Sequence, residues 1–284
     1  MNILLFGAFG HLGQALLKDL DAKGYNIKAV GRTVRGDWTG SKRVRTVQCD
    51  IMDKNCIKGI CQDMDMVIST VGLTKASKEV THYDVDYKGN LELLKEAISS
   101  GVKKFIYISV IKCDEREDIP MLHAKYLFEK ELEKSGMEYT IYRPTGYFYD
   151  IAKVFQPMIE KGEVKLFKDS KVSGNVVSVK DFSQYIVGNL PSKRNEVIEV
   201  GGKETYTYEE IATMFFEAAG KPINISYVSP KVFDIIALVS KIKKNGNYAN
   251  IKFGQWTLSN EMVASNCIGR DSFKEYIFRS VNKK

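Results

Sequence analysis

Apolar and polar residues alternate along the first 150 residues in a way that predicts strands and helices in turn. Short apolar runs of strand length precede amphipathic stretches of helix length. Several of these runs are almost continuously apolar, as expected of strands that helices cover on both faces. The β-α-β alternation predicts an α/β fold with a doubly wound parallel sheet, whose ligand crevice lies at the carboxyl ends of the strands. The predicted strands are 2–6, 25–30, 45–49, 65–71, 103–110 and 138–143.

The pattern is less regular after about residue 150. We therefore expect a larger domain over residues 1–150 and a smaller C-terminal α/β lobe over 151–284, interleaved with the first, that contacts a substrate or partner. The apolar stretch 232–239 is a candidate for touching a membrane, but its length fits a docking or core helix better. Strands are predicted near 163–167, 176–179, 196–200 and 224–228, and helices near 181–190, 208–219, 230–243 and 270–278.

Three glycines, Gly7, Gly10 and Gly13, follow the first predicted strand and open the first predicted helix. In a dinucleotide-binding loop the first glycine permits a tight turn, the second lets the backbone approach the phosphates, and the third allows close helix–strand packing. Backbone N–H groups and the helix dipole then favour an anion. Glycine turns also occur without a ligand, so the surrounding β-α-β pattern carries the prediction of a Rossmann-type domain. The predicted cofactor-binding residues are Gly7, Phe9, Gly10, His11, Leu12, Gly13, Arg32, Asp50, Ile51, Thr70 and Val71.

Arg32 stands at the end of the second predicted strand, where the adenosine ribose binds in such a sheet. A carboxylate there accepts from the 2′-hydroxyl of NAD(H), whereas an arginine pairs with the 2′-phosphate of NADP(H). Positive charge is added by Arg35, Lys42, Arg43 and Arg45, although an exposed basic loop without a ligand is the alternative. We predict NADP(H) rather than NAD(H). Asp50, after the third strand, is placed either to accept from the adenine amino group or to cap the next helix.

Composition narrows the choice of protein class. The chain has 284 residues, of which 44% are hydrophobic, and no apolar run reaches the length of a membrane span. We expect a cytoplasmic protein, because the start shows no signal-peptide pattern. Most of the net charge of +7 arises in residues 151–284, with 20 Lys and Arg against 14 Asp and Glu. No basic run interleaved with aromatic residues accompanies it, so we expect no nucleic-acid partner, and oligomeric state is open.

The five cysteines are the next candidates for chemistry. Their number is odd and they show no C-x-x-C spacing, so we expect neither a disulfide framework nor a zinc site, and no metal at all. They are Cys49, Cys56, Cys61, Cys113 and Cys267.

Further motifs extend along most of the chain. They are Asp50 after the third strand, the segments 86–94 and 101–109, Tyr142-Arg143-Pro144-Thr145, and the segments 177–181 and 200–202. With the glycine loop, these motifs make the chain resemble the short-chain dehydrogenase/reductase superfamily, in its atypical, NmrA-like branch. Segments 124–132 and 143–148 are similar to divinyl chlorophyllide reductase-like proteins. The resemblance implies an NAD(P)-binding oxidoreductase that acts on a small molecule.

The resemblance also implies a catalytic serine, tyrosine and lysine. Ser109 and Lys125 match the serine and the lysine, and Lys125 would also hold the nicotinamide ribose. The tyrosine position, four residues before the lysine, is Met121, and a thioether cannot transfer a proton. His123 is a further candidate acid, because imidazole titrates near neutral pH. Candidate substrate contacts in the second lobe are Tyr147, Phe148 and Tyr149.

Three functions are compatible with this set of residues. The first is an NADPH-dependent reductase in which the proton comes from Lys125, water or a tyrosine of the second lobe. The second is a regulator that senses NADP without turnover, as loss of the tyrosine would predict. The third is a complex-assembly subunit with a structural cofactor. The retained lysine and serine favour the enzyme.

Overall fold

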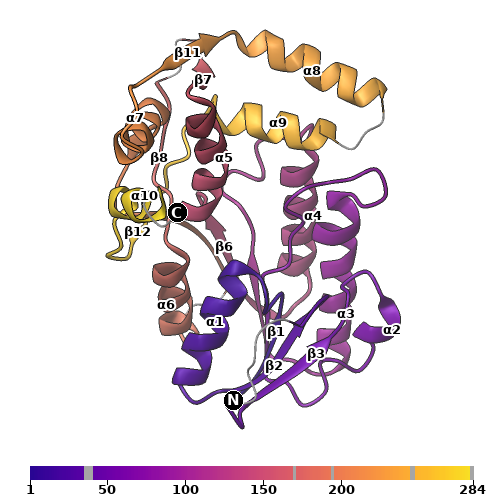
Figure 1. Ribbon diagram of the computed structural model, residues 1–284. Coiled ribbons are helices and arrows are strands. Elements are labelled where there is room, and N and C mark those ends of the chain that lie inside the picture. The colour runs from indigo at the N-terminus through magenta and orange to yellow at the C-terminus, as the bar shows by residue number, and fades with distance from the viewer. Residues whose placement is uncertain (35–40, 169–170, 193–194, 244–246, 282–284) are drawn as a thin grey trace. The chain divides into compact units, whose positions relative to one another are not determined.

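The computed structural model describes residues 1–34, 41–168, 171–192, 195–243 and 247–281 (Figure 1). Contacts divide the chain into two compact units. Unit 1 comprises Met1–Arg143 and Ser183–Ile198, and unit 2 comprises Pro144–Phe182 and Glu199–Lys284. The chain therefore passes between the units three times, after residues 143, 182 and 198.

Unit 1 is built on a parallel sheet with the strand order β9-β6-β5-β4-β1-β2-β3. Neighbouring strands from β3 to β6 all pair in parallel, which confirms the predicted doubly wound sheet. The first six strands lie within two residues of their predicted bounds. They are β1 (Asn2–Phe6), β2 (Asn26–Gly31), β3 (Val44–Gln48), β4 (Met66–Ser69), β5 (Lys104–Ile108) and β6 (Glu138–Pro144), and the strand β9 (Glu196–Gly202) continues from unit 1 into unit 2.

Helices cover both faces of this sheet (Figure 1), with α1 on one side and α3 and α4 on the other. Leucines recur at helical spacing in the first helix, which predicts an apolar stripe. This stripe, formed by Leu12, Leu16, Leu17 and Leu20, is buried throughout. The helical elements are α1 (His11–Ala22), α2 (Lys54–Ile57), the π-helix η1 (Tyr83–Gly89), α3 (Asn90–Ser99), α4 (Pro120–Lys134) and α6 (Val179–Asn189), the last of which begins in unit 2.

The π-helix η1 corrects the face predicted for the next helix. Periodicity predicts a stripe that includes Tyr87 and Ile98, but Ile98 is exposed. The buried face of α3 is instead formed by Asn90, Leu93, Leu94 and Ala97. A π-turn holds more residues than an α-turn, so a helix that begins with one presents a face shifted from the 3.6-residue pattern.

Unit 2 has its own apolar core, formed by α5 and α7 with α10. The helix α5 was not predicted, although its buried Phe148, Phe155 and Ile159 recur at helical spacing, and Pro157 interrupts the pattern. The elements are α5 (Phe148–Lys161), β7 (Val164–Phe167), β8 (Ser173–Gly174), β10 (Tyr206–Thr207), α7 (Tyr208–Ala218), β11 (Ile225–Val228), α8 (Pro230–Ile242), α9 (Asn247–Thr257), β12 (Cys267–Ile268) and α10 (Phe273–Val281).

The strand predicted at 176–179 is wrong. Val177 forms only an isolated bridge with Tyr147. Ser178 accepts a hydrogen bond from the backbone N–H of Asp181 at 3.2 Å and so caps the start of α6. Local capping chemistry therefore overrides the β propensity of the valines.

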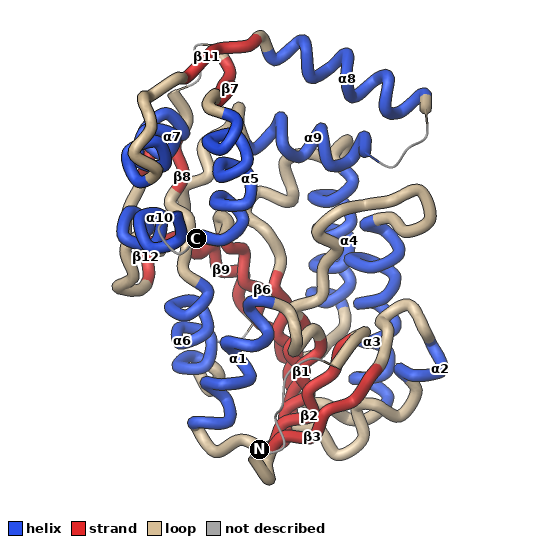
Figure 2. The backbone as a smooth tube through the Cα atoms, viewed as in Figure 1, coloured by secondary structure: helices blue, strands red, loops and turns tan. Residues whose placement is uncertain are grey.

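The helix predicted near 230–243 is present as α8, and Figure 2 shows it beside α9 within unit 2. It is not a core helix, because only Ala237 and Ser240 are buried. None of the described helices combines the length and the apolar character needed to cross a bilayer.

Candidate functional site

The glycine loop joins β1 to α1 in unit 1. Gly7 has φ of +88°, a conformation that favours glycine, and a Cβ there would collide with the side chain of Thr70. A Cβ on Gly13 would overlap backbone atoms of Gly7 and Ala8. The first and third glycines are thus required by the turn and by the close approach of helix and strand.

Gly10 needs a different explanation. Its φ of −77° and ψ of 172° suit any residue, and a Cβ would meet only the Gly7 carbonyl oxygen, at 3.4 Å. Gly10 is exposed at the N-cap of α1, where none of the described side chains supplies a capping hydrogen bond. The space beside Gly10, which a Cβ would occupy, lies at a helix N-terminus without a side-chain cap. Such a position fits the diphosphate of a dinucleotide.

Several residues predicted to bind the cofactor point their side chains into the protein. Phe9 lies over Gly31, and Leu12 and Ile51 are also buried. Thr70 donates from Oγ1 to the carbonyl oxygens of Phe6 and Gly7, at 3.2 and 3.1 Å. Such residues offer a ligand their backbone rather than their side chains. His11 is exposed, and Val71 is partly buried after β4.

A pocket of about 460 Å³ opens where β2 and β3 end. Arg32 and Asp50 both line it. Asp50 accepts from the backbone N–H of Met52 at 3.0 Å, whereas Asp53 is the N-cap of α2, where it accepts from the Asn55 N–H. The capping alternative for Asp50 is therefore wrong. Arg35, from the predicted basic run, lies outside the described residues.

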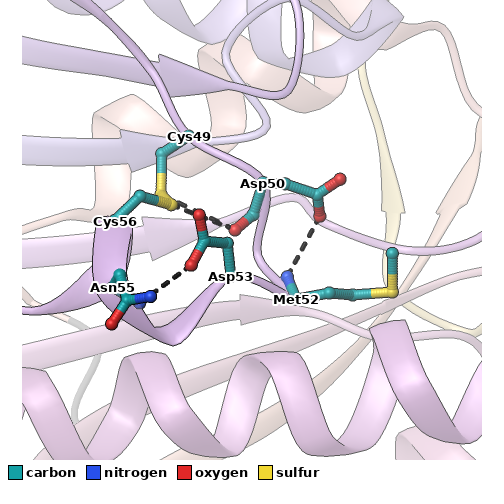
Figure 3. The surroundings of a disulfide bond; sticks show 6 residues. All are labelled: Cys49, Asp50, Met52, Asp53, Asn55 and Cys56. Carbon is teal, nitrogen blue, oxygen red and sulfur yellow. Dashed lines mark hydrogen bonds between the residues drawn. A yellow bond between two sulfur atoms is a disulfide. The ribbon is translucent and has the colours of Figure 1, made fainter.

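The same pocket contains a disulfide, which corrects one expectation from the sequence. Cys49, after β3, and Cys56, in α2, are covalently linked across a separation of 7 residues. Figure 3 shows the sulfur atoms beside Asp50, whose carbonyl oxygen lies 3.2 Å from the Cys56 Sγ. The spacing of these cysteines does not predict the disulfide, because they follow no C-x-x-C pattern. The turn after β3 and the helix α2 bring them together. In the described residues, Cys61, Cys113 and Cys267 are free, and no metal-binding cluster of His, Cys, Asp or Glu occurs.

Lys125 lies on α4 with its ammonium group almost completely buried. Nζ forms an ion pair with Oδ1 of Asp86 on η1 at 3.0 Å. It also donates over 3.4 Å to the hydroxyl of Tyr107 and to the carbonyl oxygen of Ile108. A Cβ on Gly72 would come within 3.0 Å of Nζ. Lys125 is therefore at the carboxyl ends of β4 and β5, where a doubly wound sheet binds its ligand.

Asp86 is fixed by three groups. Besides Lys125, its Oδ2 accepts from the Leu73 N–H and lies 3.1 Å from Nδ1 of His82, which is fully buried. Burial raises the pKa of Asp86, but the charges and hydrogen bonds of Lys125 and His82 outweigh burial and hold the pKa below its ordinary value. Asp86 is thus a buried anion that holds the Lys125 ammonium group in place.

A second buried ion pair orients α4. Glu129, one turn after Lys125, accepts from Arg143 of β6, with Nη2 to Oε2 at 2.6 Å. Nη1 of Arg143 pairs with Asp114 at 3.0 Å, and Cys113 donates from Sγ to Glu129. Residues four apart share a helix face, so one face of α4 is held by η1 through Lys125 and by β6 through Glu129.

The other catalytic candidates have structural partners in unit 1. Ser109, directly after β5, donates from Oγ to the Sγ of Cys113 at 3.7 Å. His123 Nδ1 lies 3.0 Å from the hydroxyl of Tyr83. Met121, in the tyrosine position, is partly buried. The structure therefore brings Lys125 and Ser109 to the end of one strand and ties His123 to η1.

The candidate substrate contacts belong to unit 2. Tyr147 stacks on Tyr149, with ring centroids 5.5 Å apart. Phe148 is buried in the core of unit 2 against Phe273 and Tyr276, so packing accounts for this aromatic residue. Burial is the main cause that raises the pKa of Tyr147 well above its ordinary value.

Asp86, His82 and Tyr107 were not among the predicted site residues. His82 and Asp86 stand four residues apart beside a helical pattern, and that spacing brings two polar side chains together. This spacing was the available signal for the pair. Tyr107 lies within an apolar strand, and nothing in that pattern points to a contact with Lys125.

Comparison with known proteins identifies the family. The sequence profile of the NmrA-like family matches residues 1–266. The chain belongs to the NmrA-like family. Photosystem II assembly factor Ycf39 of Trieres chinensis is 22% identical over 246 residues, covering 85% of this chain and 76% of the relative. Divinyl chlorophyllide a 8-vinyl-reductase of Cucumis sativus is 26% identical over 254 residues, covering 82% and 60%. The predicted resemblance is confirmed.

Solved structures confirm the fold. A triphenylmethane reductase from Citrobacter superposes with a TM-score of 0.77 at 19% identity, over the whole of both chains. The NADPH-dependent quinone oxidoreductase from Escherichia coli, solved with NADPH, gives a TM-score of 0.73 at 18% identity, over 99% of this chain and all of that chain. An epimerase from Thermus thermophilus, solved with NAD, covers 89% of this chain and 98% of its own, with a TM-score of 0.66 at 19% identity. This family of folds therefore accommodates both nicotinamide cofactors.

Proposed function

We propose that the chain is an NADPH-dependent reductase of a small organic molecule. The observation that carries the proposal is the buried Lys125 ammonium, which Asp86 holds at the carboxyl ends of β4 and β5 in the same unit as the glycine loop. The named activities of the relatives and of the structural neighbours are consistent with the proposal.

In this proposal the cofactor is NADP(H). Gly10 and the N-terminus of α1 hold the diphosphate, and Arg32 pairs with the 2′-phosphate in the pocket that it shares with Asp50. Lys125 has three N–H donors. Asp86 takes one, and the two 3.4 Å contacts are long enough to be exchanged for hydroxyls of the nicotinamide ribose. Bound NADPH supplies a hydride.

The proton must have a source other than the usual tyrosine. Tyr107 is beside Lys125, but it is fully buried. Burial, together with the charges of Asp86 and Glu129, raises the pKa of Tyr107 far above its ordinary value. We therefore assign the proton to Lys125 or to water, and we retain Tyr147 and Tyr149 of unit 2 as the candidate substrate contacts.

Stopped-flow oxidation of NADPH tests this proposal with a panel of enones, quinones and aldehydes. We expect a single-turnover loss of NADPH absorbance with at least one acceptor. Lys125→Met should abolish it and weaken NADPH binding. Lys88→Met, which removes an exposed lysine of η1 that pairs with Asp84 at the surface, is the matched control. Full activity in Lys125→Met would refute the role of this lysine.

Met121 favours a second candidate function, a cofactor-dependent regulator or assembly subunit without turnover. Ycf39 relatives are named as assembly factors. This alternative predicts that NADPH binds but is not oxidised by any acceptor, and that a stable protein partner is retained in a pull-down. Met121→Tyr separates the two further, because gain of carbonyl reduction would show that only the proton donor is missing from a competent site.

A further inference from the structure

The outer face of α8 carries the largest group of exposed aliphatic side chains in the described part of the chain. Each of six residues is between 44% and 72% exposed. At about 100° per residue, their positions fall within an arc of about 160° on one side of the helix. Single exposed aliphatic residues are ordinary, whereas a contiguous helical face is not. The six are Val232, Ile235, Ile236, Leu238, Val239 and Ile242.

The opposite side of α8 explains how the helix is held in unit 2. Ala237 and Ser240 are buried there, and Phe233 packs edge-on against Phe167 with centroids 4.9 Å apart. Asp234 pairs with Lys252 of α9 at 3.2 Å. The helix therefore packs on the rest of unit 2 through the narrow side that carries Phe233, Ala237 and Ser240, and its wider aliphatic face is exposed to solvent.

Lysines stand at both ends of this aliphatic face. Lys231 lies in the first turn, Lys241 in the last turn, and Lys243 is the C-cap residue, and all three are exposed. The single acidic residue of α8, Asp234, is paired with Lys252. The face is therefore aliphatic with a positively charged border.

We infer that α8 docks on the surface of an anionic lipid bilayer. Its aliphatic side chains would enter the acyl boundary while the lysines contact anionic headgroups, as in interfacial helices. The 13 residues of α8 extend about 20 Å, too short to span the hydrocarbon core, so the helix would lie along the surface. This inference does not depend on the proposed reductase activity.

The charge and the side-chain types of the exposed α8 face favour a lipid surface over a protein as its partner. Protein interfaces are enriched in Trp, Tyr and Arg and depleted in Lys, and the exposed face of α8 has the reverse composition. In a second copy of this chain, packed antiparallel on the first, Lys231 would face Lys243. Like charges at both ends would oppose that dimer.

Vesicle co-sedimentation tests the inference with the full chain. We expect binding to vesicles of phosphatidylcholine with phosphatidylserine, weaker binding as salt is raised, and little binding to phosphatidylcholine alone. Ile235→Ser with Ile242→Ser should weaken binding at least about tenfold, and so should Lys231→Glu with Lys243→Glu. Because these side chains are exposed, thermal unfolding should be unchanged.

The matched controls make the same kinds of substitution outside α8. Ile98→Ser alters an aliphatic residue of unit 1 that is 47% exposed, and Lys18→Glu with Lys103→Glu makes the same change in net charge. Neither should alter binding by more than about twofold. Failure to bind anionic vesicles, equal binding to neutral ones, or indifference to the α8 substitutions would overturn the inference. So would a dimer that the Ile235 and Ile242 substitutions dissociate in the absence of lipid.

Discussion

Replacing Asp86 by Asn tests the buried pair that organises the candidate site. The substitution keeps the shape of the side chain and the acceptor for the Leu73 N–H. It removes the negative charge 3.0 Å from the Lys125 Nζ and can turn an amide donor toward an ammonium donor. Lys125 would then be buried without a counter-ion.

The expected loss of unfolding free energy follows from the distance between Asp86 and Lys125 and from the burial of the pair. At 3.0 Å, two unit charges attract by about 5.5 kcal/mol at an effective dielectric constant of 20. Because the surroundings of Lys125 can relax, the net loss is smaller, and breaking a buried pair typically costs about 3–5 kcal/mol. We expect Asp86→Asn to lower the free energy of unfolding by about 3 kcal/mol and to weaken NADPH binding, because Lys125 is no longer held in place.

Urea unfolding followed by circular dichroism measures this effect, and Asp84→Asn is the control on the same π-helix. Asp84 pairs with Lys88 and accepts from Thr81 at the surface, and asparagine keeps an acceptor for Thr81, so the substitution should cost less than about 1 kcal/mol. The double variant Asp86→Asn, Lys125→Met should recover more than half of the lost stability, because neither charge is then left unpaired. Equal costs for the Asp84 and Asp86 variants, or no recovery in the double variant, would refute the reasoning.

Three further predictions concern other parts of the chain. Burial raises the pKa of Asp150 to about 6, so the folded state favours its protonated form. The free energy of unfolding should therefore fall by about 2 kcal/mol as the pH rises from 4 to 6. Asp150→Asn should flatten this part of the stability profile. Reduction of the bond between Cys49 and Cys56, which closes a short loop, should lower unfolding free energy by about 2–3 kcal/mol and release two thiols, whereas Cys49→Ser should make stability insensitive to reductant. Gly10→Ala should change stability by less than about 1 kcal/mol while weakening NADPH binding at least about tenfold, and unchanged NADPH affinity would count against the phosphate cradle.

Much of unit 1 could be predicted because the central strands β1, β4 and β5 are apolar runs bounded by polar residues. β1 occupies the predicted residues, and the Leu12–Leu20 stripe is buried as expected. The errors lie where local chemistry departs from a regular period. The π-helix η1 rotates the face of α3, Ser178 starts a helix after a pair of valines, and α5 continues through Pro157.

In the candidate site, too, some features could be predicted from the sequence and others could not. The glycine turn has a local signature, and so has the position of Arg32 at the end of a strand. The pairing of Lys125 with Asp86 joins residues 39 positions apart on two helices, and the disulfide depends on how the turn after β3 folds. Contacts of this kind are set by the tertiary structure and have no periodic trace in the sequence.

The central claim is that the glycine loop and Arg32 hold NADP(H). Calorimetric titration of the full chain with NADPH and with NADH measures it directly. We predict that NADPH binds at least about tenfold more tightly than NADH, and that Arg32→Ser removes this preference by weakening NADPH alone. Comparable affinities for the two cofactors in the unsubstituted chain would contradict the claim.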